Sequence, residues 1–167
     1  MSYVEPGFDS EDLHPIDIVE TLAAERDWDF DRIGDDQIAM AINGLWSTYS
    51  VTLALSRQDE SLRLISAFEV DPPDESVREL HAAMSLANER CWTGAFVLWS
   101  DQNLMAYRYS LNLAGGATAT SSQINDMVRC AIAACERFYP TFQVVMAGEL
   151  SAENALELAI SEAYGRA

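Results

Sequence analysis

Alternating apolar and polar residues predict strands in two blocks of the chain. The first block holds four predicted strands and the second holds two, and turn residues separate neighbouring strands. Asn43-Gly44, a strong signal for a tight hairpin, falls between the second and third strands. The predicted strands are 30–33, 37–43, 46–56, 61–70, 93–99 and 104–113. Strands joined this closely predict an antiparallel sheet.

Apolar residues at helical spacing predict helices before, between and after these strands. Pro15 suits the first position of a helix, and Asp74 suits the N-cap of another. One apolar stripe stays in phase from Ile124 to Met146, across Pro140. Because proline has no N–H to donate, this stripe predicts a kink or two nearly collinear helices there. The predicted helices are 15–27, 74–90, 124–146 and 151–164.

The order of these elements, α-β-β-β-β-α-β-β-α-α, predicts an α+β fold. An antiparallel sheet of about six strands is expected, with the helices packed on it. No internal stretch reads as a linker, so residues 14–167 are expected to form a single domain. Residues 1–13 read as an acidic tail in front of it, and residues 1–36 carry 12 acids but two arginines.

Charge narrows the choice of partners. The chain has 27 acidic and 10 basic residues, a net charge of -17, and all ten basic residues are arginine. Such a field repels phosphate groups, so neither nucleic acid nor a membrane is an expected partner. The lack of lysine excludes phosphate-binding-loop enzymes, protein kinases and enzymes that form a Schiff base.

Motifs for catalysis, cofactors and metals are missing from the sequence. It has two histidines, no GxSxG elbow, no HExxH, no CxxC and no EF-hand loop. His81 lies beside the apolar stripe of the second helix, where a packing role is expected. We therefore predict no catalytic residue, no cofactor and no metal site. A hydrolase that uses serine, aspartate or cysteine groups stays open as a minor alternative.

Cysteine usage and the N-terminal sequence predict a cytoplasmic protein. Three cysteines are an odd number without framework spacing, which favours a reducing compartment. The first twelve residues have neither the basic region nor the apolar core of a signal peptide. No apolar stretch approaches the length of a membrane span.

One face of the predicted sheet is the candidate binding surface. Alternation places bulky residues such as Tyr49 on one side and small or polar residues on the other. This second face has one large aromatic residue, Trp46, and is either a solvent-facing surface or a binding surface. Helices or a second subunit that covered it would instead make Trp46 part of a core. The candidate binding residues are Trp46, Arg63, Glu69, Arg108 and Asn112.

Three segments of the chain match the pattern of a known protein family: NGLWSTYSVTLAL at 43–55, NLMAYRYSLNL at 103–113 and the C-terminal stretch 124–167. They resemble the YbjN family. Arg108, the triplet Phe138-Tyr139-Pro140 and Gly148 carry most of the resemblance. It implies a fold like that of type III secretion chaperones and a role as a regulator of sensory transduction. The family brings no catalytic residues to transfer.

Together these observations predict a non-catalytic cytoplasmic binding protein, chaperone-like or regulatory, that engages a protein or peptide partner. A homodimer is compatible with this prediction. The alternative is a small-ligand sensor that uses the sheet face of Trp46 and Arg108. A stoichiometric protein partner would favour the first prediction, and a retained metabolite would favour the second.

Overall fold

The computed structural model describes residues 13–165. It has one six-stranded antiparallel sheet and four α-helices, in the predicted order along the chain. The strands are β1 (Asp29–Arg32), β2 (Gln37–Asn43), β3 (Thr48–Ser56), β4 (Ser61–Glu69), β5 (Gly94–Trp99) and β6 (Leu104–Asn112). The helices are α1 (Pro15–Glu25), α2 (Val77–Asn88), α3 (Ser121–Met146) and α4 (Ala152–Gly165). The predicted α+β fold is therefore confirmed.

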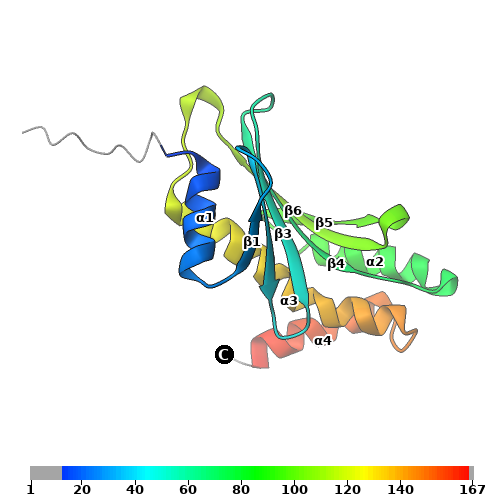
Figure 1. The fold of residues 1–167 in the computed structure, drawn as a ribbon. Helices are drawn as coiled ribbons and strands as arrows, with labels where there is room; N and C mark the ends of the chain where they lie inside the picture. The colour runs from blue at the N-terminus through cyan, green and yellow to red at the C-terminus, as the bar shows by residue number, and fades with distance from the viewer. Residues whose placement is uncertain (1–12, 166–167) are drawn as a thin grey trace, which may run out of the picture.

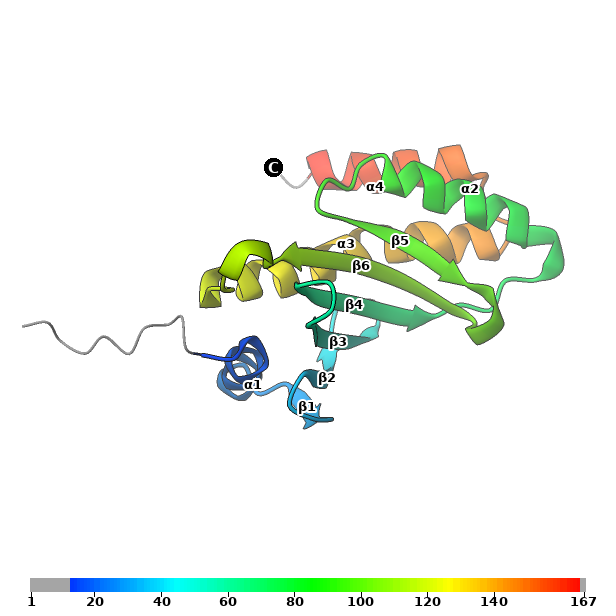
Figure 2. The same cartoon turned by 90° about the horizontal axis from the view of Figure 1, so that it is seen from above.

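The helices cover one face of the sheet, and the other face is open (Figures 1 and 2). In space the strands follow the order β1-β2-β3-β4-β6-β5. Helix α1 packs against β1, β2 and β3, α3 packs against β4 and β6, and α2 packs against β5. Helix α4 packs on α2 and α3. The core therefore lies between the sheet and a layer of helices.

The side-chain alternation of the strands agrees with the predicted inward faces. Tyr49, Val51 and Leu53 of β3 are fully buried beneath the helices. Aromatic residues from the sheet meet those of α3, and the Phe142 ring lies 5.3 Å from Phe96 between centroids. Because apolar surface removed from water is the main favourable term in folding, this cluster anchors α3 to the sheet.

Two helices start away from their predicted positions: α3 begins at Ser121, three residues before the predicted start, and α2 begins later than predicted. Asp74 does not cap α2: residues Asp74–Ser76 form a short 3₁₀ turn, and α2 begins at Val77. The reason is tertiary, because the buried Ser76 hydroxyl donates to the Met146 carbonyl at 3.1 Å and holds this turn against α3. His81 was expected to pack beside the apolar stripe of this helix, but it is exposed.

Pro140 lies inside α3, which continues as one helix from Ser121 to Met146. Of the two predicted alternatives, the pair of nearly collinear helices is wrong, and the kink at Pro140 stays a prediction. The shared apolar stripe is confirmed, since Ile124 and Met146 are both buried. Proline removes the bond to the Glu136 carbonyl. Packing of both halves on the same sheet holds the helix together despite that loss.

A cluster of three side chains ties the start of α1 to the sheet. The Asp36 carboxylate accepts two hydrogen bonds from Arg57, at 2.9 and 3.0 Å. His14 Nδ1 accepts the N–H of Ile16 at 3.1 Å and so caps α1. The proton of a neutral ring is then on Nε2, which donates to Asp36 at 2.9 Å. Arg57 first and His14 second lower the pKa of Asp36 below its ordinary value.

The lowered pKa of Asp36 predicts a loss of stability in acid. Its contribution to folding is fully present above the ordinary carboxyl pKa of about 4 and falls as pH drops through the lower folded value. We expect the difference in unfolding free energy between wild type and Asp36→Asn to stay constant above about pH 5 and to shrink below about pH 4. Urea titrations from pH 3 to 7 measure it, with Asp35→Asn as the control. Parallel pH profiles of the unfolding free energy for wild type and Asp36→Asn would contradict a lowered pKa of Asp36.

Candidate functional site: a cleft where the sheet divides

Strands β3 and β4 separate at one end of the sheet. Their pairing runs from Ser56 opposite Ser61 as far as Ser50 opposite Ala67, and stops there. Beyond that point β3 pairs only with β2, and β4 pairs only with β6. Figure 1 shows the hairpin of β2 and β3 turning away from β4, β6 and β5. The sheet is therefore divided into two arms.

Tyr139 of α3 fills the space beneath the point of division. Its ring makes edge-on contacts with Tyr49 of β3, at 6.4 Å between centroids, and with Phe68 of β4, at 5.1 Å. Tyr49 and Phe68 are the first residues of the two strands beyond the last pair. Aromatic contacts of this geometry stabilise by about 0.5–1.5 kcal/mol beyond the area they bury. The helix therefore supports the two arms with a single aromatic side chain.

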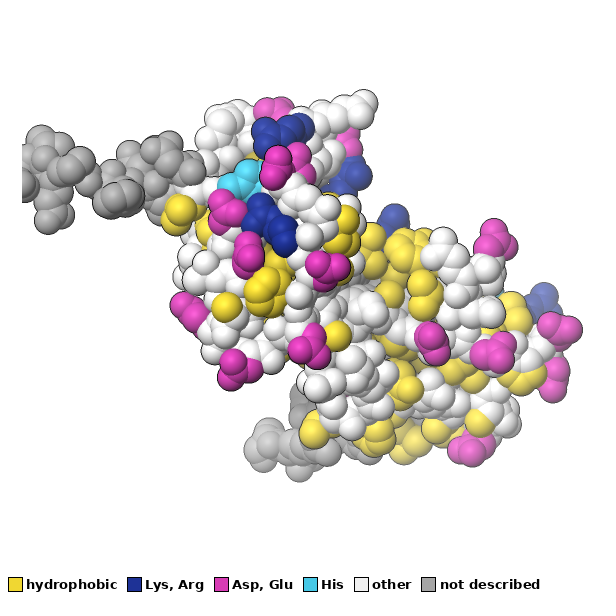
Figure 3. All heavy atoms as spheres, viewed as in Figure 1, with side chains coloured by type: hydrophobic (Ala, Val, Ile, Leu, Met, Phe, Trp, Pro, Cys, Tyr) yellow, Lys and Arg dark blue, Asp and Glu magenta, His cyan; other side chains and the backbone are white. Residues whose placement is uncertain are grey.

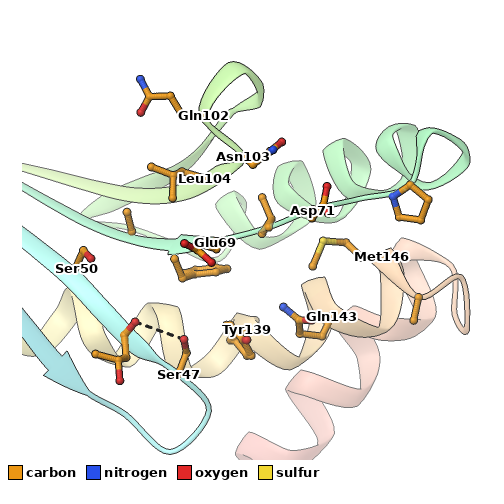
Figure 4. Close-up of a pocket in the computed structure, with 16 residues that line it drawn as sticks. Ser47, Ser50, Glu69, Asp71, Gln102, Asn103, Leu104, Tyr139, Gln143 and Met146 are labelled. Atoms are coloured by element: carbon orange, nitrogen blue, oxygen red, sulfur yellow. Dashed lines mark hydrogen bonds between the residues drawn. The ribbon is translucent and has the colours of Figure 1, made fainter.

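Between the arms lies a cleft of about 1000 Å³. Figure 4 shows Ser47 and Ser50 on one wall, Glu69 and Asp71 on the other, and Tyr139 and Gln143 on the floor. The full lining is Ser47, Thr48, Ser50, Ala67, Phe68, Glu69, Val70, Asp71, Pro73, Gln102, Asn103, Leu104, Tyr139, Gln143, Met146 and Ala147. These residues include two carboxylates and no cation, so the cleft favours a basic ligand.

Glu136 of α3 holds the loop between β2 and β3 at the end of one arm. Its Oε1 atom accepts the N–H of Trp46 at 3.5 Å, and its carboxylate lies against Gly44. The hydroxyl of Tyr49 and the Oε2 atom of Glu136 are buried and have no hydrogen-bond partner among the described residues. Burial, followed by the nearby Glu136, raises the pKa of Tyr49 far above its ordinary value. Tyr49 therefore stays a neutral phenol beside this carboxylate.

Four of the predicted site residues lie on strands at the open face. Arg63 of β4 and Arg108 of β6 are diagonal neighbours there, since Arg63 pairs with Ser110 and Arg108 with Ile65. Both arginines are exposed, and Arg63 forms an ion pair with Asp59. The Asn112 side chain accepts the N–H of Ala114 at 2.9 Å, so it stabilises the turn after β6. Glu69 lies apart from this group, at the wall of the cleft.

Trp46 does not join the arginines. It lies in the loop before β3 and is 55% exposed, whereas Arg63 pairs with Ala54 near the far end of that strand. Strand β3 begins at Thr48, so Trp46 lies outside the strand whose face carries Ala54. The predicted single face of Trp46, Arg63 and Arg108 is thus corrected to two separate places. The reason is that the loop at 44–47 bends toward Glu136 and leaves the sheet before Trp46.

The floor of the cleft was not predicted from the sequence as part of a binding surface. Tyr139 and Gln143 stand four residues apart, each next to a buried member of the apolar stripe, Phe138 or Phe142. An aromatic and an amide at this spacing share one flank of a helix. This shared flank is the sequence signal that could have indicated the floor of the cleft. What faces that flank depends on the division of the sheet, which alternation alone does not show.

Other kinds of site were also sought in the described part of the chain. Among residues 13–165, no group of three histidine, cysteine, aspartate or glutamate side chains could hold a metal ion. In the same part, each helix is too short or too polar to span a membrane. Burial raises the pKa of Cys135 to about 12, so this thiol is protonated and inert at neutral pH.

The fold and the cleft define an α+β protein with helices on one face of a divided antiparallel sheet and a groove between its arms. The chain belongs to the YbjN family, described as "Putative bacterial sensory transduction regulator", which matches residues 15–144. The resemblance found in the sequence is thereby confirmed. A search of curated proteins gave no match.

A solved structure with a similar fold is "Crystal structure of YbjN, a putative transcription regulator from E. coli". The two chains share 15% identity with a TM-score of 0.52, and the similarity covers 80% of this chain and 90% of the other. At this identity the likeness concerns the fold alone. The predicted likeness to type III secretion chaperones stays a prediction, as does the division into a tail at 1–13, most of which lies outside the described residues, and a domain at 14–167.

Proposed function

We propose that the chain is a non-catalytic cytoplasmic regulator that binds a protein or peptide partner in the cleft between β3 and β4. The observation that carries this proposal is the end of the β3–β4 pairing at Ser50 and Ala67, above a floor formed by α3. Folded proteins normally close such a gap. Backbone groups left unpaired at a strand edge destabilise the fold when they are buried, and an open edge promotes aggregation. A partner segment in the cleft would cover both.

The shape and polarity of the cleft favour a peptide over a small molecule. Small-molecule pockets are mostly apolar, occupy about 300–1000 Å³ and enclose most of their ligand. This cleft lies at the upper end of that range, is open to solvent and is lined largely by polar residues. Figure 3 shows acidic side chains spread over this side of the molecule and few basic ones. With a net charge of -17, this surface would speed the approach of a basic partner.

The alternative, a small-ligand sensor, now rests on Arg63 and Arg108 without Trp46. Arg108 is exposed on the open face and has no ion-pair partner among the described residues. The partner-capture experiment described below tests this surface separately from the cleft, through the variant Arg63→Ala/Arg108→Ala. A homodimer and the cytoplasmic location remain part of the proposal, and the three free thiols suit a reducing compartment.

Filling the cleft should abolish partner binding. Gln143→Trp puts a large side chain on the floor of the cleft, whereas Ala133→Trp adds the same side chain at an exposed position of the same helix. We expect wild type and Ala133→Trp to capture the same partner from native extract. Gln143→Trp should capture at least tenfold less of it, which corresponds to a loss of about 1.4 kcal/mol in binding free energy. Quantitative mass spectrometry of the captured protein measures this.

Three results would overturn the proposal, provided that circular dichroism shows all variants to be folded. One is equal capture by Gln143→Trp and Ala133→Trp. Another is loss of the partner with Arg63→Ala/Arg108→Ala, which would move binding to the open face. The third is a wild-type chain that retains a metabolite and no protein, which would favour the sensor.

A further inference from the structure

The direction of the backbone groups shows which strand edge is free inside the cleft. In an antiparallel sheet, both backbone groups of a residue point to the same neighbouring strand, and successive residues alternate. The Glu60 carbonyl accepts the N–H of Leu113 at 2.7 Å, and the N–H of Val70 donates to Asn103 at 2.9 Å. Even-numbered residues of β4 therefore face β6. It follows that the N–H and C=O of Glu69 face the β3 side.

The same argument applies to β3. Leu55 donates its N–H to the Asp36 carbonyl at 2.8 Å, so odd-numbered residues of β3 face β2 and Thr48 faces β4. Thr48 and Glu69 would be the next hydrogen-bonded pair after Ser50 and Ala67, but the ladder does not include them. The divided sheet therefore presents the backbone of Glu69 toward the cleft.

The outer edges of the sheet are less available. At β5, the Asn88 side chain accepts the N–H of Phe96 at 2.6 Å and donates to its carbonyl at 3.0 Å, so an amide already occupies the place of a strand partner. β1, at the opposite edge, has four residues, and short edge strands are a common protection against strand pairing. The Glu69 edge of β4 is thus the strongest candidate for an added strand.

Side chains at this edge define what the added strand would carry. Glu69 and Asp71 are exposed, two residues apart, and neither has an ion-pair partner among the described residues. Residues directly opposite them on an added strand would lie on the same face, where opposite charges stabilise. The residue between would point the other way, toward the floor with Tyr139 and Met146.

We propose that the cleft binds an extended segment of alternating basic and apolar residues, which adds to β4 as a strand at Glu69 and Asp71. This proposal rests on the proposed function of the same cleft and names the chemistry of its ligand. Backbone hydrogen bonds would supply the affinity, and the alternate side chains would supply the selectivity.

A designed peptide tests the pairing directly. The probe is a nine-residue peptide of alternating arginine and valine with blocked ends, titrated by calorimetry against the full chain. Arginines opposite Glu69 and Asp71 would direct their own N–H groups toward β4. We expect methylation of the arginine amides to weaken binding at least tenfold. Methylation of the valine amides, on the other edge of the peptide, should preserve binding.

Two pairs of substitutions test the charges. Glu69→Gln/Asp71→Asn should weaken binding of the unmodified peptide several-fold and reduce its dependence on salt. Asp29→Asn/Asp31→Asn removes a pair of exposed acids with the same spacing from β1 and should change the affinity little. Equal loss with both double variants, or equal binding of the two methylated peptides, would overturn the proposal, because charge alone would then explain binding.

The outcomes also separate this proposal from the proposed function. If the peptide fails to bind while Gln143→Trp still releases the native partner, strand addition at β4 is overturned and the cleft remains the binding site. If Gln143→Trp keeps its partner while the peptide binds as expected, the proposed function fails instead. A chain that sediments as a dimer, and becomes a monomer with Glu69→Gln/Asp71→Asn, would show that a second copy occupies this edge, which also overturns the proposal.

Discussion

Phe142→Ala is expected to lower the free energy of unfolding by about 3–5 kcal/mol. Phe142 is fully buried, and its ring stacks on Phe68 at 6.2 Å and meets Phe96 edge-on at 5.3 Å between centroids. Truncation would leave a cavity between α3 and the arm formed by β4, β6 and β5. Because domains of this size are stable by only about 5–15 kcal/mol, the loss would be a large part of the total. Urea unfolding followed by circular dichroism measures it.

Two further variants serve as controls for this measurement. Trp92 is an equally apolar aromatic residue but is 98% exposed, so Trp92→Ala should change stability by less than about 0.5 kcal/mol. Phe142→Leu should lower the free energy of unfolding by less than Phe142→Ala does. It keeps the test measurable if Phe142→Ala does not fold. A Phe142→Ala variant within about 1 kcal/mol of wild type would contradict the proposed role of this ring as the anchor of α3.

Gly44→Ala is expected to destabilise the fold by about 1–3 kcal/mol, through crowding rather than backbone strain. A Cβ at this position would collide with the Glu136 carboxylate and would lie 2.7 Å from the Tyr49 ring. The loop between β2 and β3 would then have to move away from α3. Gly34→Ala is the matched control, because a Cβ there meets nothing within 4 Å.

A double-mutant cycle assigns the crowding to Glu136. In a Glu136→Ala background, Gly44→Ala should cost less than it does in wild type, with a coupling of about 0.5–3 kcal/mol, because the colliding carboxylate is gone. Thermal and urea unfolding of the four proteins give the cycle. Additive effects would show that Glu136 does not hold this loop, and that the position of the β2–β3 arm has another cause.

The element order could be predicted from the sequence because each element carries its own local signal. The sequence of β3 alternates along its length and that of β4 alternates from Leu62 to Leu64, and the inward residues Tyr49 and Leu64 are buried as the alternation requires. Pro15 at the start of α1 shows that a local steric preference can survive folding. Predictions failed where a contact from far along the chain intervened, as at Asp74, where Ser76 is held by Met146 of α3.

The candidate site depends more on tertiary structure than the fold does. Glu69 could be selected as a polar residue on the small-residue face, and it does line the cleft. Trp46 was selected by the same alternation, but it lies in the loop before β3 and therefore outside the sheet face that carries Arg63 and Arg108. Alternation identifies a face only while the strand continues, and a sequence pattern does not mark where pairing with the neighbouring strand ends.

The sequence by itself determined the α+β class, the order of strands and helices, the acidic charge without lysine and the resemblance to the YbjN family. These follow from residue types and short-range spacing. Only the tertiary structure decided that β3 and β4 separate, that Tyr139 supports both arms and that the Glu69 backbone faces a cleft. Each of these depends on contacts between residues about 20 to 90 positions apart, and such contacts arise when α3 packs on the sheet and its side chains compete with strand pairing for the same space.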